Sequence, residues 1–436
     1  MSKPSFAIPR GMKDIDREEM AKRLWVEDRI LEVLRTYGFQ LVEPSPIESL
    51  ETLEAKCGPA IKDEIYWFED KAGRKQGLRF DLTVGLSRMV ATDTFLPMPL
   101  KVCALSNMWR YDEPQFGRYR CFYQWDAEIF GSPEVEADGE AISLSIDTLK
   151  NLGLSTVSAR INSRKLIEGF LKLNGINTQT QLESALRTID KFRKLPEKEL
   201  RAEFEKIGIS KVTTERILEL ASIQGPPEKV LAEIPLNVKN HESAAKGLED
   251  LNRLVDILGA FGKLGQCLYD MSIVRGIGYY DGIVFEVYEN KDSQIGAVVG
   301  GGRFDGLCKT FGRDIPATGA AGGIERIILA LEKAGVLPNL NQAPKVFVAT
   351  VDDSVLAEAW KIVGQLRSAG ISADFDLKKR SLSRQLEFAN TLGVSFTIIL
   401  GPRELQKRTA KLRDMRSRRE KEVELTKIAD EIKKGQ

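Results

Sequence analysis

The chain has 436 residues, 42% of them hydrophobic, so it is long enough for several domains with buried cores. Its 64 lysines and arginines stand against 63 acidic residues, a formal net charge of +1. This balance excludes a protein that is basic over its whole surface, so any contact with nucleic acid must be local. The only histidine, His241, lies in a polar stretch, which excludes hydrolases and metalloproteases that work through histidine side chains.

Several common sites and signals are missing from the sequence. The five cysteines are widely spaced and form no CxxC pair, so we predict neither a disulfide framework nor a zinc site. The Walker A pattern is absent, and Asp281 stands where the third glycine of a GxGxxG motif would follow Gly276 and Gly278. The first residues lack the apolar core of a signal peptide, and no run of about 18 apolar residues occurs. We therefore expect a soluble, cytoplasmic protein with no membrane partner.

The first part of the chain alternates helical and strand-like sequence. A stretch with apolar residues at helical spacing comes first, and glycines and prolines separate it from short strands. A long hairpin follows. The expected elements are, in order, a helix over 17–37, strands over 39–42, 65–70 and 78–81, a helix over 85–92, and two long strands within 100–131.

The residue pattern changes twice in the rest of the chain. Charged helical sequence follows Gly153 and lasts to about Gly262, which we interpret as a helical insertion. Strand-like sequence with many glycines then returns, and a helix over 323–334 closes it. After that, strand and helix alternate, which predicts a small α/β domain with a mostly parallel sheet. The expected organisation is a split first domain over 1–154 and 263–336, the insertion over 155–262, a linker over 337–344 and a last domain over 345–436.

The second strand of the long hairpin has two chemically different faces. Its odd-numbered residues suit packing, whereas the even-numbered ones from 118 to 128 are polar or charged around one aromatic, Phe122. For an ordinary strand, a solvated face is the commoner reason for such a row. Here Arg118 and Arg120 could bind phosphate beside a ring on which a base stacks, and Arg110 ends the partner strand. This face therefore predicts a nucleotide platform.

Two further segments have residues that could bind a phosphate, although each pattern also has a simpler structural explanation. Arg326 falls in the first turn of a helix, where the positive end of the helix dipole disfavours a cation unless an anion lies nearby. A local ion pair with Glu325 would also account for it. Gly300, Gly301 and Gly302 would let a ligand approach the backbone, but a bulge or a turn in the sheet is the commoner reason for such glycines.

Taken together, these segments resemble the histidyl-tRNA synthetases, which are class II aminoacyl-tRNA synthetases. The hairpin from Arg110 to Glu128 resembles motif 2, and the later AAGGIERIILAL resembles motif 3. The stretch LRFDLTVGLSR is similar to the amino-group motif in its archaeal and eukaryotic form. The stretches SIVRGIGYYDG and GGGRFDGL resemble the two histidyl signatures. Near the end, KLRDMRSRREKEVEL resembles a strand pair of the family's anticodon-binding domain.

The resemblance implies an α+β fold. An antiparallel-sheet class II catalytic domain would hold the helical insertion and would be followed by a C-terminal α/β anticodon-binding domain. It also implies a homodimer formed through roughly residues 17–46. The implied activity is that of a histidine–tRNA ligase, which activates L-histidine with ATP and Mg²⁺ and then transfers it to tRNA(His), without zinc.

The resemblance also assigns site residues by matching positions. Arg110 and Arg275 would contact the α-phosphate of ATP, with Arg275 as the catalytic arginine of the histidyl group. Arg118 and Arg326 would hold the β and γ phosphates, and Phe122 would stack on adenine. Histidine would be bound by Asp81, Thr83, Gln124, Glu128, Arg275, Tyr279 and Tyr280. The tRNA contacts are expected at Arg403, Lys411, Arg413 and Arg416, and no residue is expected to bind a metal.

Two positions depart from the family, and some alternatives stay open. Gly278 stands where an acidic residue is usual, and Phe304 where tyrosine is common, which leaves the local pocket contacts open. The alternatives are a non-catalytic, synthetase-like regulatory subunit of histidine biosynthesis, a class II synthetase for another amino acid, and a non-catalytic tRNA-binding protein. The place of the insertion between motifs 2 and 3 gives the hypothesis that it grips the acceptor stem of the tRNA.

Overall fold

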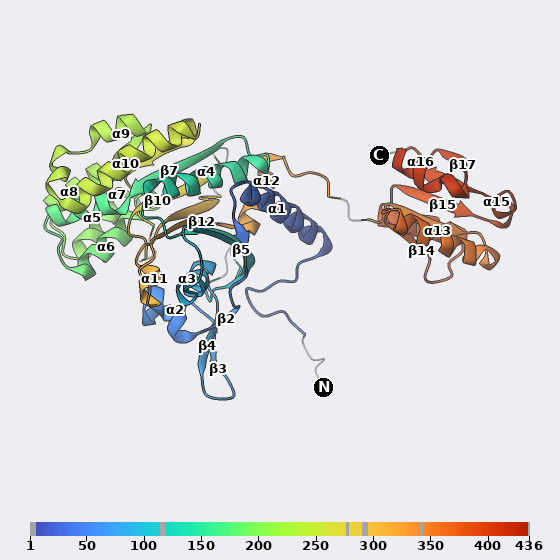
Figure 1. Ribbon diagram of the computed structural model, residues 1–436, viewed down its shortest axis with the longest axis horizontal. Coiled ribbons are helices and arrows are strands. Elements are labelled where there is room, and N and C mark those ends of the chain that lie inside the picture. The colour runs from blue at the N-terminus through green and yellow to red at the C-terminus, as the bar shows by residue number, and fades with distance from the viewer. Residues whose placement is uncertain (1–5, 114–118, 276–278, 290–294, 341–342, 435–436) are drawn as a thin grey trace. The chain divides into compact units, whose positions relative to one another are not determined.

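The computed structural model describes residues 6–113, 119–275, 279–289, 295–340 and 343–434. The chain forms two compact units, Met1–Pro338 and Asn339–Gln436 (Figure 1). Within the ranges described, there is no helix whose length and apolar content would let it cross a membrane.

A nine-stranded sheet forms the centre of the first unit. Its strand order is β1-β5-β6-β12-β11-β10-β7-β9-β8, and the pairings from β5 to β7 are all antiparallel. Only β1 with β5 and β7 with β9 pair in parallel. This confirms the α+β fold with an antiparallel catalytic sheet. The strands are β1 (Gln40–Leu41), β5 (Leu100–Trp109), β6 (Cys121–Phe130), β7 (Val157–Ser163), β8 (Gln224–Gly225), β9 (Cys267–Asp270), β10 (Ile283–Glu289), β11 (Val299–Arg303) and β12 (Ala317–Gly323).

Three helices pack around the sheet and share its largest apolar core, namely α1 (Arg17–Thr36), α4 (Val135–Asn151) and α12 (Ile324–Ala334). The first helix begins after Asp16, whose side chain accepts the backbone N–H groups of Glu18 and Glu19. Its buried stripe, which includes Val26 and Ile30, meets the core at helical spacing. Helix α12 ends at Gly335, which adopts the left-handed conformation that glycine allows.

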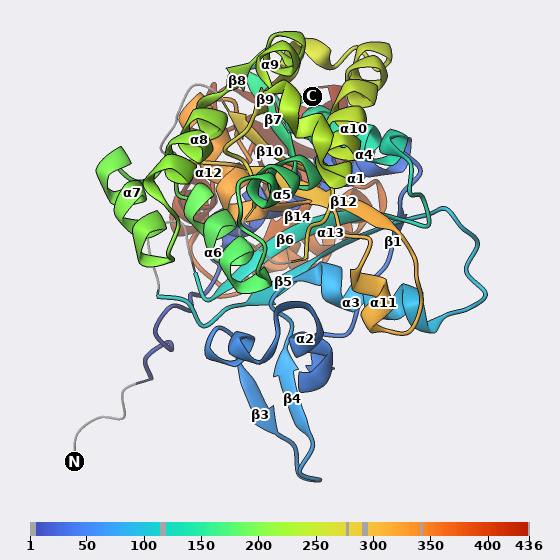
Figure 2. The ribbon, with the colours of Figure 1, turned by 90° about the vertical axis from the view of Figure 1, so that its left-hand side faces the viewer.

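A smaller group of elements precedes the long hairpin. It consists of β2 (Ile47–Ser49), α2 (Leu50–Cys57), a 3₁₀ turn (Pro59–Asp63), β3 (Trp67–Glu69), β4 (Lys75–Leu78) and α3 (Leu82–Thr92). Figure 2 shows the β3–β4 hairpin extending away from the main sheet beside α2. The predicted strand 78–81 and helix 85–92 are displaced, because the Asp81 carboxylate accepts the Val84 N–H and so starts α3 at Leu82. The short α11 (Leu307–Thr310) packs against α3.

A run of helices gathers at the β7 end of the sheet (Figure 1). These are α5 (Arg164–Leu173), α6 (Gln179–Ile189), α7 (Glu197–Lys206), α8 (Lys211–Ser222), α9 (Pro227–Glu233) and α10 (Glu242–Ala260), with 3₁₀ turns at Leu236–Asn240 and Leu264–Gln266. His241 directly precedes α10.

The stretch interpreted as a helical insertion over 155–262 also contains two strands of the main sheet, β7 and β8. Strand β7 pairs with β10 along its whole length, from Val157 to Ser163. The signal for this strand was present, because the apolar Val157, Ala159 and Ile161 alternate with the polar Ser158, Arg160 and Asn162. The longer charged helical segments that follow outweighed it, and the interpretation of 155–262 as helical was therefore wrong at this strand.

The second unit has a five-stranded sheet in the order β14-β13-β15-β16-β17. The pairings of β13 are parallel, whereas β16 and β17 pair antiparallel, so the sheet is mixed rather than mostly parallel as predicted. The strands are β13 (Val346–Thr350), β14 (Ala373–Phe375), β15 (Phe396–Leu400), β16 (Thr409–Asp414) and β17 (Glu420–Glu424). The helices are α13 (Leu356–Ser368), α14 (Leu382–Leu392), α15 (Pro402–Gln406) and α16 (Ile428–Lys434), with 3₁₀ turns at Asp353–Val355 and Leu425–Lys427.

A buried ion pair ties the main sheet to α4. Arg303, at the end of β11, donates from Nη2 to Oδ2 of Asp138 in α4 over 2.7 Å, and both side chains are almost fully buried. The same guanidinium donates to the carbonyl oxygens of Ser132 and Glu134 just before that helix. The arginine of the GGGRFDGL stretch is therefore a structural anchor.

We predict that Arg303→Met lowers the free energy of unfolding by about 3–5 kcal/mol, because it leaves the Asp138 carboxylate buried without its partner. Adding Asp138→Leu removes the second charge and should recover much of this loss. Urea-induced unfolding of the two variants measures both effects. A loss below about 1 kcal/mol in the single variant would contradict a structural role for the pair.

Candidate active site

A cleft of about 350 Å³ lies in the first unit, and residues from separate parts of the chain line it. Its walls come from the starts of α3 and α12, the end of β5, and strands β6, β10, β11 and β12. The predicted site residues that line it are Asp81, Thr83, Arg110, Phe122, Gln124, Arg275, Tyr279, Tyr280 and Arg326. Of the other two, Arg118 lies outside the described residues, and Glu128 lies behind Thr83.

Two of the cleft's arginines are held by backbone carbonyl groups. Arg110 follows β5, and its Nε donates to the carbonyl oxygen of Phe80 over 2.9 Å. Its guanidinium lies 5.0 Å from the centre of the Phe122 ring. Arg326, in the first turn of α12, donates from Nη1 to the carbonyl oxygen of Ala297 over 2.7 Å. Both guanidinium groups are therefore oriented before any ligand binds.

The third arginine, Arg275, has an unusual backbone conformation. Its φ is 51°, in the left-handed region that non-glycine residues rarely adopt, and such strain is commonly found at functional sites. The preceding segment is fixed by Asn162, whose Nδ2 donates to the carbonyl oxygens of Met271 and Ile273. The guanidinium lies against β11, where a Cβ on Gly300 would come within 1.7 Å of Nη1. Gly300 therefore makes room for a protein side chain, a reason that the sequence did not suggest.

Acidic and polar side chains form one end of the cleft. Thr83 Oγ1 lies 2.8 Å from Glu128 Oε1 and 3.3 Å from Asp126 Oδ2. Gln124 Nε2 donates to Asp126 Oδ1 over 2.7 Å. A Cβ on Gly319 of β12 would lie 1.6 Å from Glu128 Oε2, so this glycine also makes room for a site side chain. Two buried carboxylates beside the cleft favour a positively charged group in it.

Asp126 was missed as a candidate residue. It lies on the same even-numbered face of β6 as Gln124 and Glu128, which was the available signal. The sequence could not show that its two carboxylate oxygens contact Gln124 and Thr83.

The tyrosine pair also lines the cleft. The rings of Tyr279 and Tyr280 are 4.3 Å apart between centroids, and their hydroxyl oxygens are 3.0 Å apart. Burial, together with the nearby Asp81 carboxylate, raises the pKa of Tyr279, so its hydroxyl stays protonated at neutral pH. Tyr279 therefore presents a neutral hydroxyl group to the cleft.

The two departures from the family pattern have different outcomes. Phe304 is almost fully buried, and its ring packs edge-on against Tyr279 at 5.8 Å and against Phe130 at 6.3 Å. A phenylalanine thus fits this position as a support for the tyrosine pair. Gly278 lies outside the described residues.

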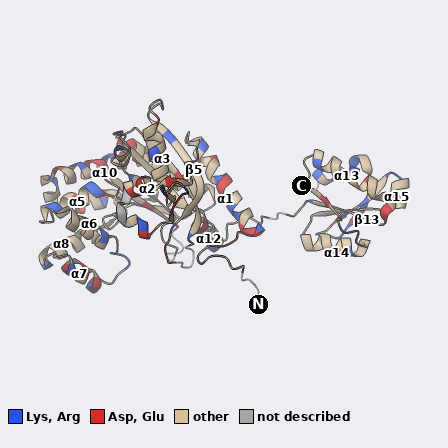
Figure 3. Ribbon diagram, turned by 90° about the horizontal axis from the view of Figure 1, so that it is seen from below, with Lys and Arg blue, Asp and Glu red and all other residues tan. Residues whose placement is uncertain are grey.

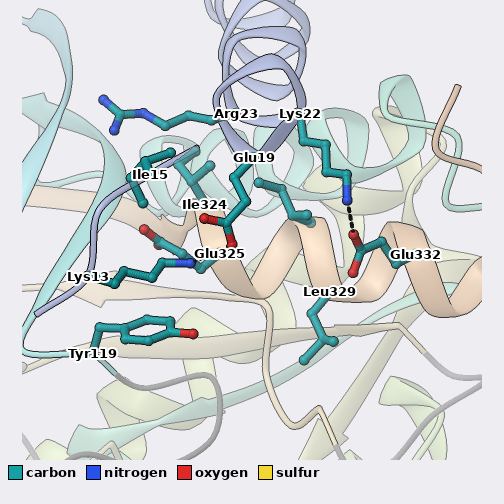
Figure 4. A pocket seen from close by; sticks show the side chains of 11 residues that line it. Lys13, Ile15, Glu19, Lys22, Arg23, Tyr119, Ile324, Glu325, Leu329 and Glu332 are labelled. Carbon is teal, nitrogen blue, oxygen red and sulfur yellow. Dashed lines mark hydrogen bonds and ion pairs between the residues drawn. The ribbon is translucent and has the colours of Figure 1, made fainter. Parts of the chain in front are cut away.

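A second cavity, of about 260 Å³, lies between α1 and α12 and is shown in Figure 4. Its cations have acidic partners: Lys13 donates to Glu19, and Lys22 to Glu332, each over 2.7 Å. Arg23 pairs with Glu27 in the same way. Because these charges are already compensated, this cavity is a poorer phosphate site than the cleft.

The predicted tRNA-binding residues lie on the second unit, where basic and acidic residues are interspersed (Figure 3). Arg403 is in α15, Lys411 and Arg413 are in β16, and Arg416 follows that strand. Arg413 pairs with Glu420 on β17 at 3.5 Å, whereas the other three side chains are exposed. Acidic residues of β17 thus offset part of the positive charge.

Metal-binding groups are not evident in the described part of the chain. Cys103, Cys121, Cys267 and Cys308 are free thiols. Where residues are described, no three or more His, Cys, Asp or Glu side chains are grouped so that they could hold a metal ion.

Comparison with known proteins gives the same fold and family. The chain matches the family model described as Histidyl-tRNA synthetase over residues 11–327, and the Anticodon binding domain over 345–435. It is 37% identical to the histidine–tRNA ligase of Pyrococcus furiosus, covering 97% of this chain and 98% of that protein. It is 38% identical to that of Aeropyrum pernix over 91% of each. The crystal structure of histidyl-tRNA synthetase from Nostoc sp. PCC 7120 superimposes with a TM-score of 0.85, at 27% identity and full coverage of both chains.

The antiparallel sheet and its cleft are those of a class II aminoacyl-tRNA synthetase. Within this class, the two full-length relatives compared above are both histidine–tRNA ligases. The chain belongs to the histidyl-tRNA synthetase family.

We predict that Gly319→Ala lowers the free energy of unfolding by about 1–3 kcal/mol, because its methyl group would overlap the Glu128 carboxylate and the Ala127 carbonyl. Gly323→Ala is the matched control, since a Cβ at the other end of β12 meets no atom within 4 Å. Thermal unfolding compares the two. Equal losses in both variants would show that the tight packing at Gly319 is not responsible.

Proposed function

We propose that this chain is a histidine–tRNA ligase that activates L-histidine with ATP in the cleft and transfers it to tRNA(His). The main support for this proposal is that Arg110, Arg275 and Arg326 line the same cleft as the tyrosine pair. Cations converge where a polyphosphate would lie, and a polar pocket for an amino acid adjoins them. Full-length relatives bearing the name histidine–tRNA ligase support the same activity.

In the first step, a carboxylate oxygen of histidine attacks the α-phosphorus of ATP, and the bond to the pyrophosphate oxygen breaks. Arg110 and Arg275 would stabilise the negative charge that develops at the α-phosphate. Arg118 and Arg326 would hold the outer phosphates, and Arg326 lies at the start of α12, where the helix dipole also favours an anion. Adenine would stack on Phe122, close enough for Arg110 to reach the phosphate of the same nucleotide.

Histidine would bind at the polar end of the cleft. Its ammonium group would lie near Asp81, Thr83, Gln124 and the buried Glu128, and we add Asp126 to this set. The hydroxyl groups of Tyr279 and Tyr280 would read the imidazole by hydrogen bonds. Leaving these polar groups unpaired would penalise an apolar amino acid of similar size heavily, so the pocket could discriminate without editing.

Mg²⁺ would enter with the ATP phosphates. This ion usually keeps several waters and takes one or two carboxylates, and exposed Asp112 on the cleft wall suits such a contact. Its chemical contribution would be to neutralise phosphate charge while this chain's arginines orient the nucleotide.

In the second step, a hydroxyl of the terminal adenosine of the tRNA takes the histidyl group and AMP leaves. Since the second unit belongs to an anticodon-binding family, we propose that Arg403, Lys411, Arg413 and Arg416 contact the tRNA there. We also propose a homodimer through residues 17–46, where Leu24 and Leu41 leave apolar side chains exposed. The chain would work in the cytoplasm, where its tRNA and ATP are.

The expected result of ATP–pyrophosphate exchange, measured with each amino acid in turn, is exchange with histidine alone. The reason is that only histidine would satisfy both the carboxylates and the tyrosine hydroxyls of the pocket. Exchange with another amino acid would select a synthetase of different specificity. No exchange with any amino acid would favour a regulatory or RNA-binding protein.

Replacing Arg403, Lys411 and Arg416 together with alanine should weaken tRNA binding and flatten its salt dependence, because each phosphate contact releases counterions. Histidine-dependent pyrophosphate exchange should stay within about twofold, since these residues lie in the other unit. Filter binding at several salt concentrations measures the slope. An equal loss of both activities would contradict this division of labour.

A further inference from the structure

Glu286 is a cleft residue to which no role has been assigned so far. It lies in β10, and the register places it directly opposite Gly300 of β11. Its Oε1 is 3.5 Å from Nη1 of Arg275. The glycine that leaves space for the arginine and the carboxylate that pairs with it are therefore cross-strand neighbours.

The carboxylate of Glu286 is itself fixed by a second residue of the same strand. Tyr288, two positions on and so on the same face of β10, donates its hydroxyl hydrogen to Glu286 Oε2. The guanidinium of Arg160 on the neighbouring β7 lies 4.8 Å from the centre of the Tyr288 ring. Arg160 in turn donates to Asp270 over 3.3 Å, and Arg193 from the helical run donates to the same carboxylate over 3.0 Å.

We propose that Glu286 is a positioning residue that holds the guanidinium of Arg275 where it meets the α-phosphate, and that Tyr288 holds Glu286. The proposal rests on the catalytic role proposed above for Arg275. A carboxylate would repel the phosphates of ATP directly, so its value in this cleft lies in orienting the arginine. A free arginine side chain has many rotamers, and an oppositely charged neighbour such as the Glu286 carboxylate, 3.5 Å away, selects among them.

This placement has a kinetic consequence. If the guanidinium is held before the reaction, removing Glu286 should slow the chemical step and leave ground-state binding of histidine and ATP nearly unchanged. A residue that only supports the fold would instead lower stability, or would alter binding and turnover together.

The test is a double-mutant cycle in histidine-dependent ATP–pyrophosphate exchange. Glu286→Gln should lower kcat roughly 10- to 100-fold with both KM values within about threefold, because the arginine is misplaced. Tyr288→Phe removes one hydroxyl and no packing volume, and should lower kcat by roughly 2- to 10-fold. In an Arg275→Lys background, each change should cost less than about twofold, since the oriented guanidinium is already gone.

Tyr269→Phe is the control, because it removes a buried tyrosine hydrogen bond to the Leu251 carbonyl oxygen, 2.6 Å long, that does not involve the cleft. Its kcat should stay within about twofold of the unmodified chain. Thermal unfolding of every variant shows that the fold is intact, and Tyr288→Phe keeps the test valid if Glu286→Gln unfolds.

Two outcomes would overturn the proposal. If Glu286→Gln lowers kcat by the same factor in the chain with Arg275 and in the Arg275→Lys variant, the carboxylate does not act through the arginine. If excess Mg²⁺ restores the kcat of Glu286→Gln, the carboxylate is a metal ligand. If the unmodified chain shows no exchange, the proposed function is wrong, and the role of Glu286 fails with it. This result differs from the other two because it is measured without any variant.

Discussion

Like charges repel, and the first unit nevertheless brings three guanidinium groups to the walls of a single cleft. Arg110 donates to a carbonyl oxygen before α3 and Arg326 to one before β11, and Arg275 lies 3.5 Å from the carboxylate of Glu286. These oxygen atoms offset part of the repulsion and limit the direction of each cation. The entropy cost of orienting the arginines is therefore incurred when the chain folds, and the guanidinium groups are already arranged when a polyphosphate binds.

The central strands of the sheet make this arrangement possible through their glycines. Strands β11 and β12 lie side by side, and at Gly300 and Gly319 the missing side chains leave space for Arg275 and Glu128. Glycine weakens a strand, because it loses more backbone entropy on folding and contributes no packing. Buried contacts elsewhere, such as the pair between Arg303 and Asp138, hold the same strands in place.

Much of this site follows from local sequence patterns. Strand alternation placed Phe122, Gln124 and Glu128 on one face, and the position of Arg326 at a helix start indicated an anion. The family resemblance supplied Arg275 and the tyrosine pair, which line the same cleft. These features depend on short segments of chain, so they can be read without knowing how the segments pack.

What could not be predicted depends on contacts between segments distant in the sequence. The role inferred for Glu286 comes from its register against Gly300, and Asp126 meets Thr83 only when α3 packs on β6. Val157, Ala159 and Ile161 alternate with polar residues in β7, but only the pairing with β10 shows that this short segment belongs to the main sheet. The hairpin β16–β17 likewise makes the second sheet mixed, which strand and helix alternation alone does not reveal.

A crystal structure of the chain with ATP and the unreactive alcohol analogue of histidine would show whether three separated arginines bind one triphosphate. We expect the guanidinium groups of Arg110, Arg275 and Arg326 all to lie within hydrogen-bonding distance of phosphates of the same ATP. Phosphates bound in the cavity between α1 and α12, or an Arg275 that contacts no phosphate, would contradict it.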